Sequence, residues 1–393
     1  MTMRPENSVR ADALPMFSSN RMRLTMGQWI VIFSVMLPLI SLASPAWKHF
    51  EEFAHPPDYR IPYPLSRDYW LYGRHVKQSV AEIPQPVFVV GDSIVWGEFV
   101  KRDATLPRFL GDQVDNQAVF VNAGVNGLFP LALEGLVRDY GDALHDQRVI
   151  LHCNLLWMNS PEADLSSTKE QKFNHAELVP QFRPSIPCYR ASVEERLSTV
   201  IARRSGFLSW SAHMQICYYG AKSIPLWTLD VQRSQPSGNV NAYALPWAPV
   251  SFRVPSELDE DTDRGQQSPR HRPWFDRGLN SQSFEWVPPE DSLQWAAYQR
   301  LVALLLKREN DLLVVIGPFN EHLVSPANRA GLQKWNETVA SWLQDAQVPL
   351  IAPAALASED YADASHPLTS GYRELARRVA RDPVFKHWLS PRK

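Results

Sequence analysis

Short apolar runs alternate with amphipathic stretches in two parts of the chain. The runs are rich in β-branched residues, which is typical of strands buried in a parallel sheet. The predicted strands are residues 85–92, 118–122, 148–153, 312–316 and 348–351. Helical periodicity appears between and after them, at residues 131–144, 292–308, 328–345 and 370–379. This alternation predicts an α/β fold with helices on both faces of a mainly parallel sheet of about five strands.

The alternation breaks between about residues 160 and 290. This segment is rich in Pro, Trp, Ser and charged residues, with a mixed acidic and basic tract at residues 257–264. A loop of such length inside a compact domain requires a structural reason. We interpret residues 161–289 as a large insertion over the C-terminal edge of the sheet, helical around residues 192–203 and flexible in other parts.

The longest apolar stretch lies near the N-terminus, where no charged residue occurs from Leu24 to Trp47. It is long enough to span a bilayer with some tilt. Arginines precede the stretch, whereas charges of both signs follow it. By the positive-inside rule, we expect a cytoplasmic tail at residues 1–23, a single-pass transmembrane anchor at residues 24–47, and an extracytoplasmic remainder.

A cleaved signal peptide is the alternative for the same segment. Ser41-Leu42-Ala43 has the small residues of a cleavage site, but the polar region before the apolar run is long for a signal peptide. An uncleaved anchor therefore fits the sequence better. A Pro- and Tyr-bearing lead-in at residues 48–84 would connect this anchor to the first strand.

The composition of the chain excludes some classes of protein. The chain is 45% hydrophobic and has 14 Trp, enough to bury a sizeable core. Its formal net charge of -2 and its lack of a basic run argue against nucleic-acid binding. The three cysteines, Cys153, Cys188 and Cys217, are odd in number and lack CxxC spacing, which excludes a disulfide framework. They leave open one Cys188–Cys217 bridge or three buried thiols.

The first candidate for chemistry is Ser93, in Gly91-Asp-Ser at the end of a predicted strand. A serine at a strand-to-helix turn stands clear of the sheet edge, and its own backbone N–H can face a developing oxyanion. The glycine before it allows a sharp turn. Such a tripeptide is also common in ordinary turns.

The second candidate is Asp363-Ala-Ser-His366 near the C-terminus, followed by a predicted helix. This spacing lets the carboxylate hold Nδ1–H of the imidazole while Nε2 faces a serine. Serine is a poor nucleophile until such a base removes its proton. Taken alone, the motif also fits a helix N-cap.

Together these motifs resemble those of the SGNH (GDSL-like) hydrolase family, with Gly-Asp-Ser after the first strand and Asp-x-x-His before the last helix. The resemblance implies a three-layer, flavodoxin-like α/β sandwich with Ser93, Asp363 and His366 as the catalytic residues. It covers residues 85–160 and 290–393 and leaves the insertion unmatched.

The middle motifs of the family supply the oxyanion hole. The segment after the second predicted strand resembles the second motif, which implies Gly127 as a backbone donor and leaves Gly124 as the alternative. In the third motif, usually Gly-x-Asn-Asp, this chain keeps the asparagine but lacks the glycine and the aspartate. Asn154 is the implied side-chain donor, with Asn159 as the alternative, and the N–H of Ser93 is the remaining donor.

The resemblance implies a serine-dependent esterase or acyl transferase that requires no metal or cofactor. An anchored, outward-facing enzyme of this type would act on O-acyl groups, above all O-acetyl groups, of an envelope or exported polysaccharide. Lipid ester hydrolysis is an alternative within the enzyme class. The rival from another class is a non-catalytic SGNH-like envelope protein that binds glycan or a secretion partner. The altered third motif and the insertion favour that rival, whereas the intact Ser, Asp and His argue against it.

Overall fold

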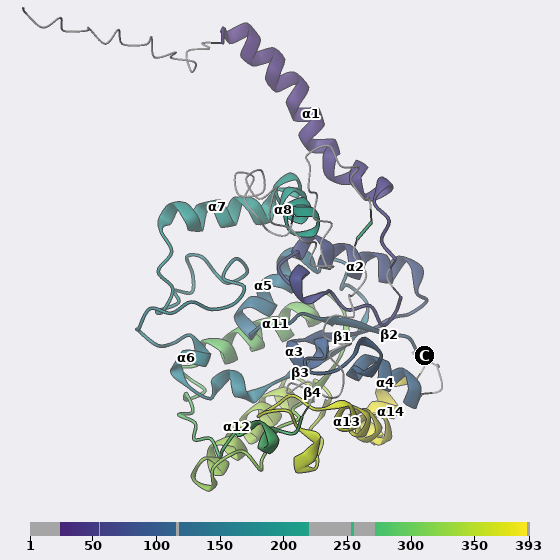
Figure 1. The fold of residues 1–393 in the computed structure, drawn as a ribbon, viewed down its shortest axis with the longest axis vertical. Coiled ribbons are helices and arrows are strands. Elements are labelled where there is room, and N and C mark those ends of the chain that lie inside the picture. Colours follow the sequence, from purple (N-terminus) through teal and green to yellow (C-terminus); the bar gives the residue numbers. More distant parts are fainter. Residues whose placement is uncertain (1–23, 55, 115–117, 220–252, 255–271, 391–393) are drawn as a thin grey trace, which may run out of the picture. The chain divides into compact units, whose positions relative to one another are not determined.

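The computed structural model describes residues 24–54, 56–114, 118–219, 253–254 and 272–390 (Figure 1). The chain divides into two units, residues 1–48 and residues 49–393. The first unit contributes most of one long helix, and the second contains the sheet and the remaining described helices.

Helix α1, Met26–Phe50, is the apolar segment near the N-terminus. None of its residues is buried, and its mean hydropathy reaches 2.0 over an 18-residue window. Its 25 residues would extend about 37 Å at 1.5 Å per residue, more than the roughly 30 Å of a bilayer core. By length and composition, α1 could cross a membrane.

The sheet has five parallel strands in the order β2-β1-β3-β4-β5. The strands are β1 Val87–Gly91, β2 Phe120–Gly124, β3 Arg148–Cys153, β4 Asp311–Ile316 and β5 Leu350–Ile351. The predicted α/β fold and strand number are confirmed, although β5 is shorter than predicted. From β1 the chain passes to β2 on one side of β1, and it then crosses over to β3 on the other side of β1. Ligands bind at such a reversal, beyond the carboxyl ends of the strands.

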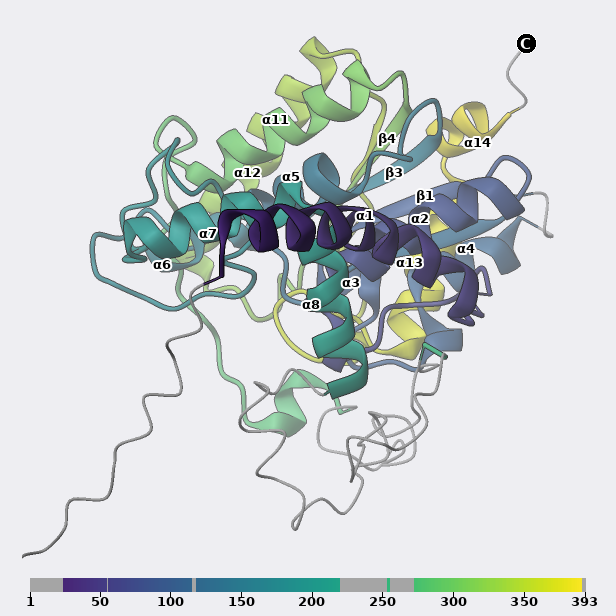
Figure 2. The same cartoon turned by 90° about the horizontal axis from the view of Figure 1, so that it is seen from above.

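The four predicted helices are present. They are α5 Pro130–Tyr140, α11 Leu293–Lys307, α12 Pro326–Asp345 and α13 Thr369–Arg381. The expected helix at 131–144 ends early, with Gly141 as its C-cap. The described helices that were not predicted include α2 Tyr69–Glu82, α4 Leu106–Gln113 and α14 Pro383–Leu389. Helix α5 packs on α11, and α13 packs on α4 and α14 (Figures 1 and 2).

Between residues 161 and 289 the described chain is partly helical. Helix α7, Val193–Arg204, matches the helix expected around 192–203 and begins with a capping box of Ser192 and Glu195. Helix α8, Gly206–Tyr219, was not predicted, because it lacks an amphipathic pattern. It packs on α7 and α2 within the same compact unit as the sheet. The charged tract at 257–264 lies outside the described residues.

A buried ionic network joins α8 to the lead-in segment. His213 Nδ1 lies 2.6 Å from Asp68 Oδ2, and His213 Nε2 lies 2.8 Å from Glu51 Oε1. Arg74 and Tyr218 both donate hydrogen bonds to Glu51. Burial lowers the pKa of His213, but the two carboxylates outweigh it and raise that pKa to about 9. The imidazolium and its partners therefore fasten α8 to the chain that leads into the sheet.

Candidate active site

Ser93 lies directly beyond the carboxyl end of β1, as the first residue of the short helix α3, Ser93–Trp96. Asp92 is the N-cap of this helix, and its Oδ1 accepts a hydrogen bond of 3.0 Å from the N–H of Ile94. Gly91 is tightly enclosed, because a Cβ there would lie 2.6 Å from Val95 Cγ2 and 2.8 Å from His152 Cβ. The turn that carries the serine is thus fixed by close packing.

Asp363 and His366 lie between β5 and α13, at the same edge of the sheet. His366 Nε2 lies 2.7 Å from Ser93 Oγ, and His366 Nδ1 lies 2.8 Å from Asp363 Oδ1. The backbone N–H groups of Ser365 and His366 also donate to Asp363 Oδ1, at 3.0 and 2.9 Å. Asn320 donates to the Asp363 carbonyl at 3.0 Å. Two motifs separated by more than 260 residues therefore form one hydrogen-bonded chain.

The electrostatics of this chain suit a general base. Burial raises the pKa of Asp363, but the neighbouring His366 and the backbone N–H donors outweigh burial and lower it to about 2. Burial lowers the pKa of His366, whereas the charge and hydrogen bond of Asp363, with a smaller contribution from Asp92, raise it overall. Asp363 is therefore ionised at neutral pH, and it stabilises the imidazolium that forms when His366 takes a proton.

Gly127 lies in the turn after β2, with a φ of +76° that favours glycine. Gly124, the alternative donor, is the last residue of β2 and pairs with Gly91 in β1. A Cβ at Gly124 would lie 2.5 Å from the backbone nitrogen of Trp96, so this glycine serves close packing of α3 on the strand. Of the two glycines, Gly127 is the one outside the sheet.

Asn154 is held by hydrogen bonds at both ends of its amide. It follows β3 as the N-cap of η3, Leu155–Met158, where its Oδ1 accepts from the N–H of Leu156 at 3.0 Å. Its Nδ2 donates to Asp92 Oδ2 at 3.1 Å. An amide nitrogen carries two hydrogens, and this contact uses one. Asn159, the alternative, lies at the opposite end of η3.

Asp92 and His152 form a second Asp–His pair, which the sequence did not reveal. His152 Nδ1 lies 3.2 Å from Asp92 Oδ1, and His152 Nε2 lies 2.9 Å from the carbonyl oxygen of Gly317. Burial raises the pKa of Asp92, but His152 and then Asn154 outweigh burial and lower it. Strand register brings the pair together, because Leu151 of β3 pairs with Val90 of β1. Asp92 and Asn154 thus lie just beyond the ends of adjacent strands.

The side of the site near His366 is lined by an aromatic ring and a guanidinium group. The Phe99 ring lies 5.5 Å from the imidazole ring of His366. Arg277 lies 4.9 Å above the Phe99 ring and donates to the Ala362 carbonyl at 2.8 Å. Arg277 belongs to η5, Trp274–Arg277, within the segment interpreted as an insertion. That segment therefore contributes a residue close to the candidate site.

One group of potential metal ligands occurs among the described residues, away from Ser93. Ligand atoms of Glu51, His213 and Cys217 lie within 4.8 Å of one another. Both imidazole nitrogens of His213 already bond to carboxylates, so the group behaves as an ion-pair network. All three cysteines of the chain are buried and free, so the open alternative of a Cys188–Cys217 bridge does not hold.

Neither a scan against protein-family models nor a search of curated proteins finds a match to this chain. Functional interpretation therefore depends on the geometry at the carboxyl edge of the sheet.

Proposed function

We propose that this protein is a serine-dependent esterase or acyl transferase of the SGNH type. The observation that carries the proposal is the continuous hydrogen-bonded chain Ser93–His366–Asp363, with contacts of 2.7 and 2.8 Å. This order of nucleophile, base and orienting carboxylate activates serine for attack on a carbonyl.

In the proposed reaction, Ser93 Oγ attacks the ester carbonyl while His366 Nε2 accepts the hydroxyl proton. Asp363 orients the imidazole and stabilises its protonated form. The tetrahedral intermediate collapses as His366 returns the proton to the leaving alcohol, and an acyl-serine remains. Water or an acceptor hydroxyl then attacks this acyl-enzyme by the same steps, so hydrolysis and acyl transfer use one site.

The proposed oxyanion hole consists of the N–H of Ser93, the N–H of Gly127 and one Nδ2 hydrogen of Asn154. As the first residue of α3, Ser93 has an N–H without a partner inside that helix. Asp92, which accepts a hydrogen bond from the N–H of Ile94, holds the Asn154 amide in one orientation and acts as a positioning residue. Each donor aimed at the oxyanion contributes roughly 3 kcal/mol of transition-state stabilisation.

The arrangement of helices and strands supports this assignment. The strand order agrees with a flavodoxin-like sheet, and the separate groups α4 with α13 and α5 with α11 agree with a three-layer sandwich. We assign residues 85–160 and 290–393 to the SGNH domain and residues 161–289 to an insertion. The proposed substrate is an O-acyl, in the first instance O-acetyl, group of an envelope or exported polysaccharide.

We also propose that α1 anchors the protein with its N-terminus in the cytoplasm and residues from 48 onward outside. The positive-inside rule motivates this orientation. Alkaline phosphatase fused after residue 60 should be active, because that reporter folds only outside the cytoplasm, whereas green fluorescent protein fused there should stay dark after Sec export. The reverse pattern would contradict the orientation.

A fluorophosphonate probe tests the proposed chemistry directly, because it labels serines that a base has activated. The full chain in detergent should be labelled, and Ser93→Ala should abolish labelling. Ser365→Ala is a matched control. This serine lies beside His366, but its side chain is not part of the Ser93–His366–Asp363 hydrogen-bonded chain. Unlabelled parent protein with a folded circular dichroism spectrum would favour the non-catalytic binding protein.

A further inference from the structure

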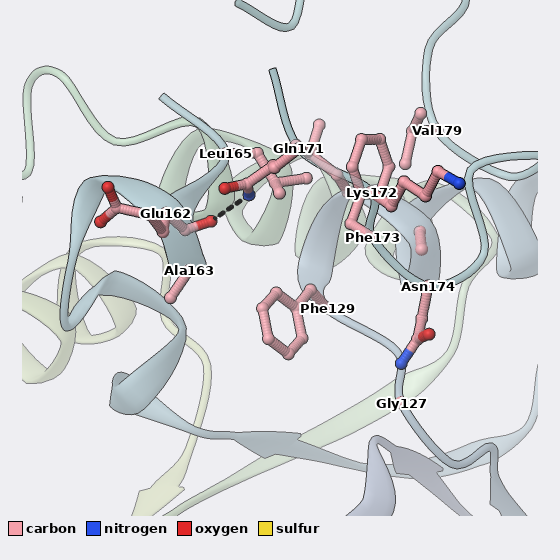
Figure 3. A pocket seen from close by; sticks show the side chains of 12 residues that line it. Gly127, Phe129, Glu162, Ala163, Leu165, Gln171, Lys172, Phe173, Asn174 and Val179 are labelled. Carbon is pink, nitrogen blue, oxygen red and sulfur yellow. Dashed lines mark hydrogen bonds between the residues drawn. The ribbon is translucent and has the colours of Figure 1, made fainter. Parts of the chain in front are cut away.

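A cavity of about 360 Å³ lies beside Gly127, outside the hydrogen-bonded chain of the proposed triad (Figure 3). Its apolar lining residues include Leu165 and Val179, both buried. It is large enough for a small organic ligand, since ligand pockets in proteins begin at about 300 Å³.

Aromatic and polar side chains share the walls of this cavity. Phe129 is the N-cap residue of α5 and is 36% exposed. Figure 3 shows its ring between Ala163 and Asn174, with Phe173 on the same wall as Asn174. The polar lining residues are Glu162, Gln171, Lys172 and Asn174.

The walls are fixed before any ligand binds. Gln171 Nε2 donates to the Glu162 carbonyl at 2.6 Å, the contact drawn in Figure 3. The Phe173 ring packs edge-on against Tyr189, with 5.4 Å between ring centroids. His175 Nε2 lies 2.8 Å from the Asn126 carbonyl oxygen. The segment 171–175 is therefore tied to the turn that carries Gly127.

The cavity adjoins the proposed oxyanion hole through Gly127. A Cβ at this position would lie 2.8 Å from Asn174 Nδ2, so only glycine permits the amide to approach so closely. The positive φ of Gly127 favours the same residue. A group bound in the cavity would thus lie next to an ester whose carbonyl oxygen occupies the hole.

We propose that this cavity binds a sugar ring of the acylated glycan, an inference that rests on the proposed function. The C–H face of a pyranose packs on aromatic rings, here Phe129 and Phe173. Its hydroxyls can bond to the side-chain amides of Asn174 and Gln171. An acyl chain would pack on the apolar lining residues but would desolvate these amides without compensation.

Phe129→Ala tests the assignment, with Phe182→Ala as a matched control. Phe182 is 48% exposed and does not line the cavity. The substrates are O-acetylated oligosaccharides from xylan and mannan, chitin oligosaccharides that have been chemically O-acetylated, and vinyl acetate, which has neither a sugar nor an aromatic ring. Phe129→Ala should raise KM about tenfold for the best oligosaccharide, as expected for loss of one aromatic contact. It should leave kcat/KM for vinyl acetate within twofold, and Phe182→Ala should change neither.

Chain-length dependence distinguishes a sugar from an acyl chain. With vinyl esters whose acyl chains have two to ten carbons, Phe129→Ala should prefer the same acyl-chain length as the parent enzyme. A changed preference with an unchanged oligosaccharide KM would overturn the sugar assignment. A parent enzyme that hydrolyses vinyl acetate through Ser93 but no oligosaccharide would also overturn it. Absence of Ser93-dependent turnover of any ester would instead contradict the proposed function itself.

Discussion

Asp363→Asn is expected to lower kcat on p-nitrophenyl acetate by roughly 10⁴-fold without unfolding the protein. The amide oxygen can still accept the backbone N–H bonds from Ser365 and His366, so the turn should persist. A neutral amide, however, cannot stabilise the imidazolium, and it can hold His366 in the wrong tautomer. Steady-state kinetics give the size of the loss, and thermal unfolding monitors the fold.

The same variant should change the pH dependence of kcat/KM. The base must be neutral, so parent activity is lost as pH falls through the raised pKa of His366, above its ordinary 6.5. Removal of the Asp363 charge removes the main cause of that elevation, and the acid limb should move to lower pH. Asp360→Asn, in the same segment, should leave both kcat and the acid limb unchanged. Asp363→Asn activity within a few-fold of the parent would exclude the proposed triad.

The strands and the Ser–His–Asp motifs could be predicted because their signals are local. A β-branched run such as residues 312–316 predicts a buried strand from its own residues, and β4 was found there. Ser93 and His366 could be assigned to one site because the two motifs together resemble those of the SGNH family. The contact itself, between residues 273 positions apart, required the structure.

Contacts that depend on register or on irregular chain could not be predicted. Asp92 and His152 meet because β1 pairs with β3 in one register, which no periodicity in either strand specifies. The segment 171–175 approaches Gly127 through a hydrogen bond of His175, which lies in chain without helical or strand periodicity. Apolar and polar residues are mixed on all sides of helix α8, so its sequence lacked the amphipathic signal.

Asn154→Ala is expected to reduce kcat by roughly 10²–10³-fold while changing KM little, because its hydrogen bond to the oxyanion forms mainly in the transition state. Kinetics on p-nitrophenyl acetate separate the two constants. The substitution also leaves Asp92 Oδ2 without a buried donor, which should cost about 1–3 kcal/mol of stability. Denaturant unfolding measures that cost separately, so assays stay at temperatures where the variant is folded.

Asn159→Ala is the matched control, because Asn159 lies at the other end of η3 from Asp92 and Asn154. Its effect on kcat should be mild. If Asn159→Ala were instead the substitution that abolished activity, Asn159 would be the oxyanion donor in place of Asn154. The third motif would then lie at the other end of η3 from where it is assigned. If neither asparagine mattered while Ser93→Ala abolished activity, backbone N–H groups or Asn174, whose amide lies against Gly127, would form the hole. The triad would survive that result, whereas the role given to Asp92 in holding the Asn154 amide would not.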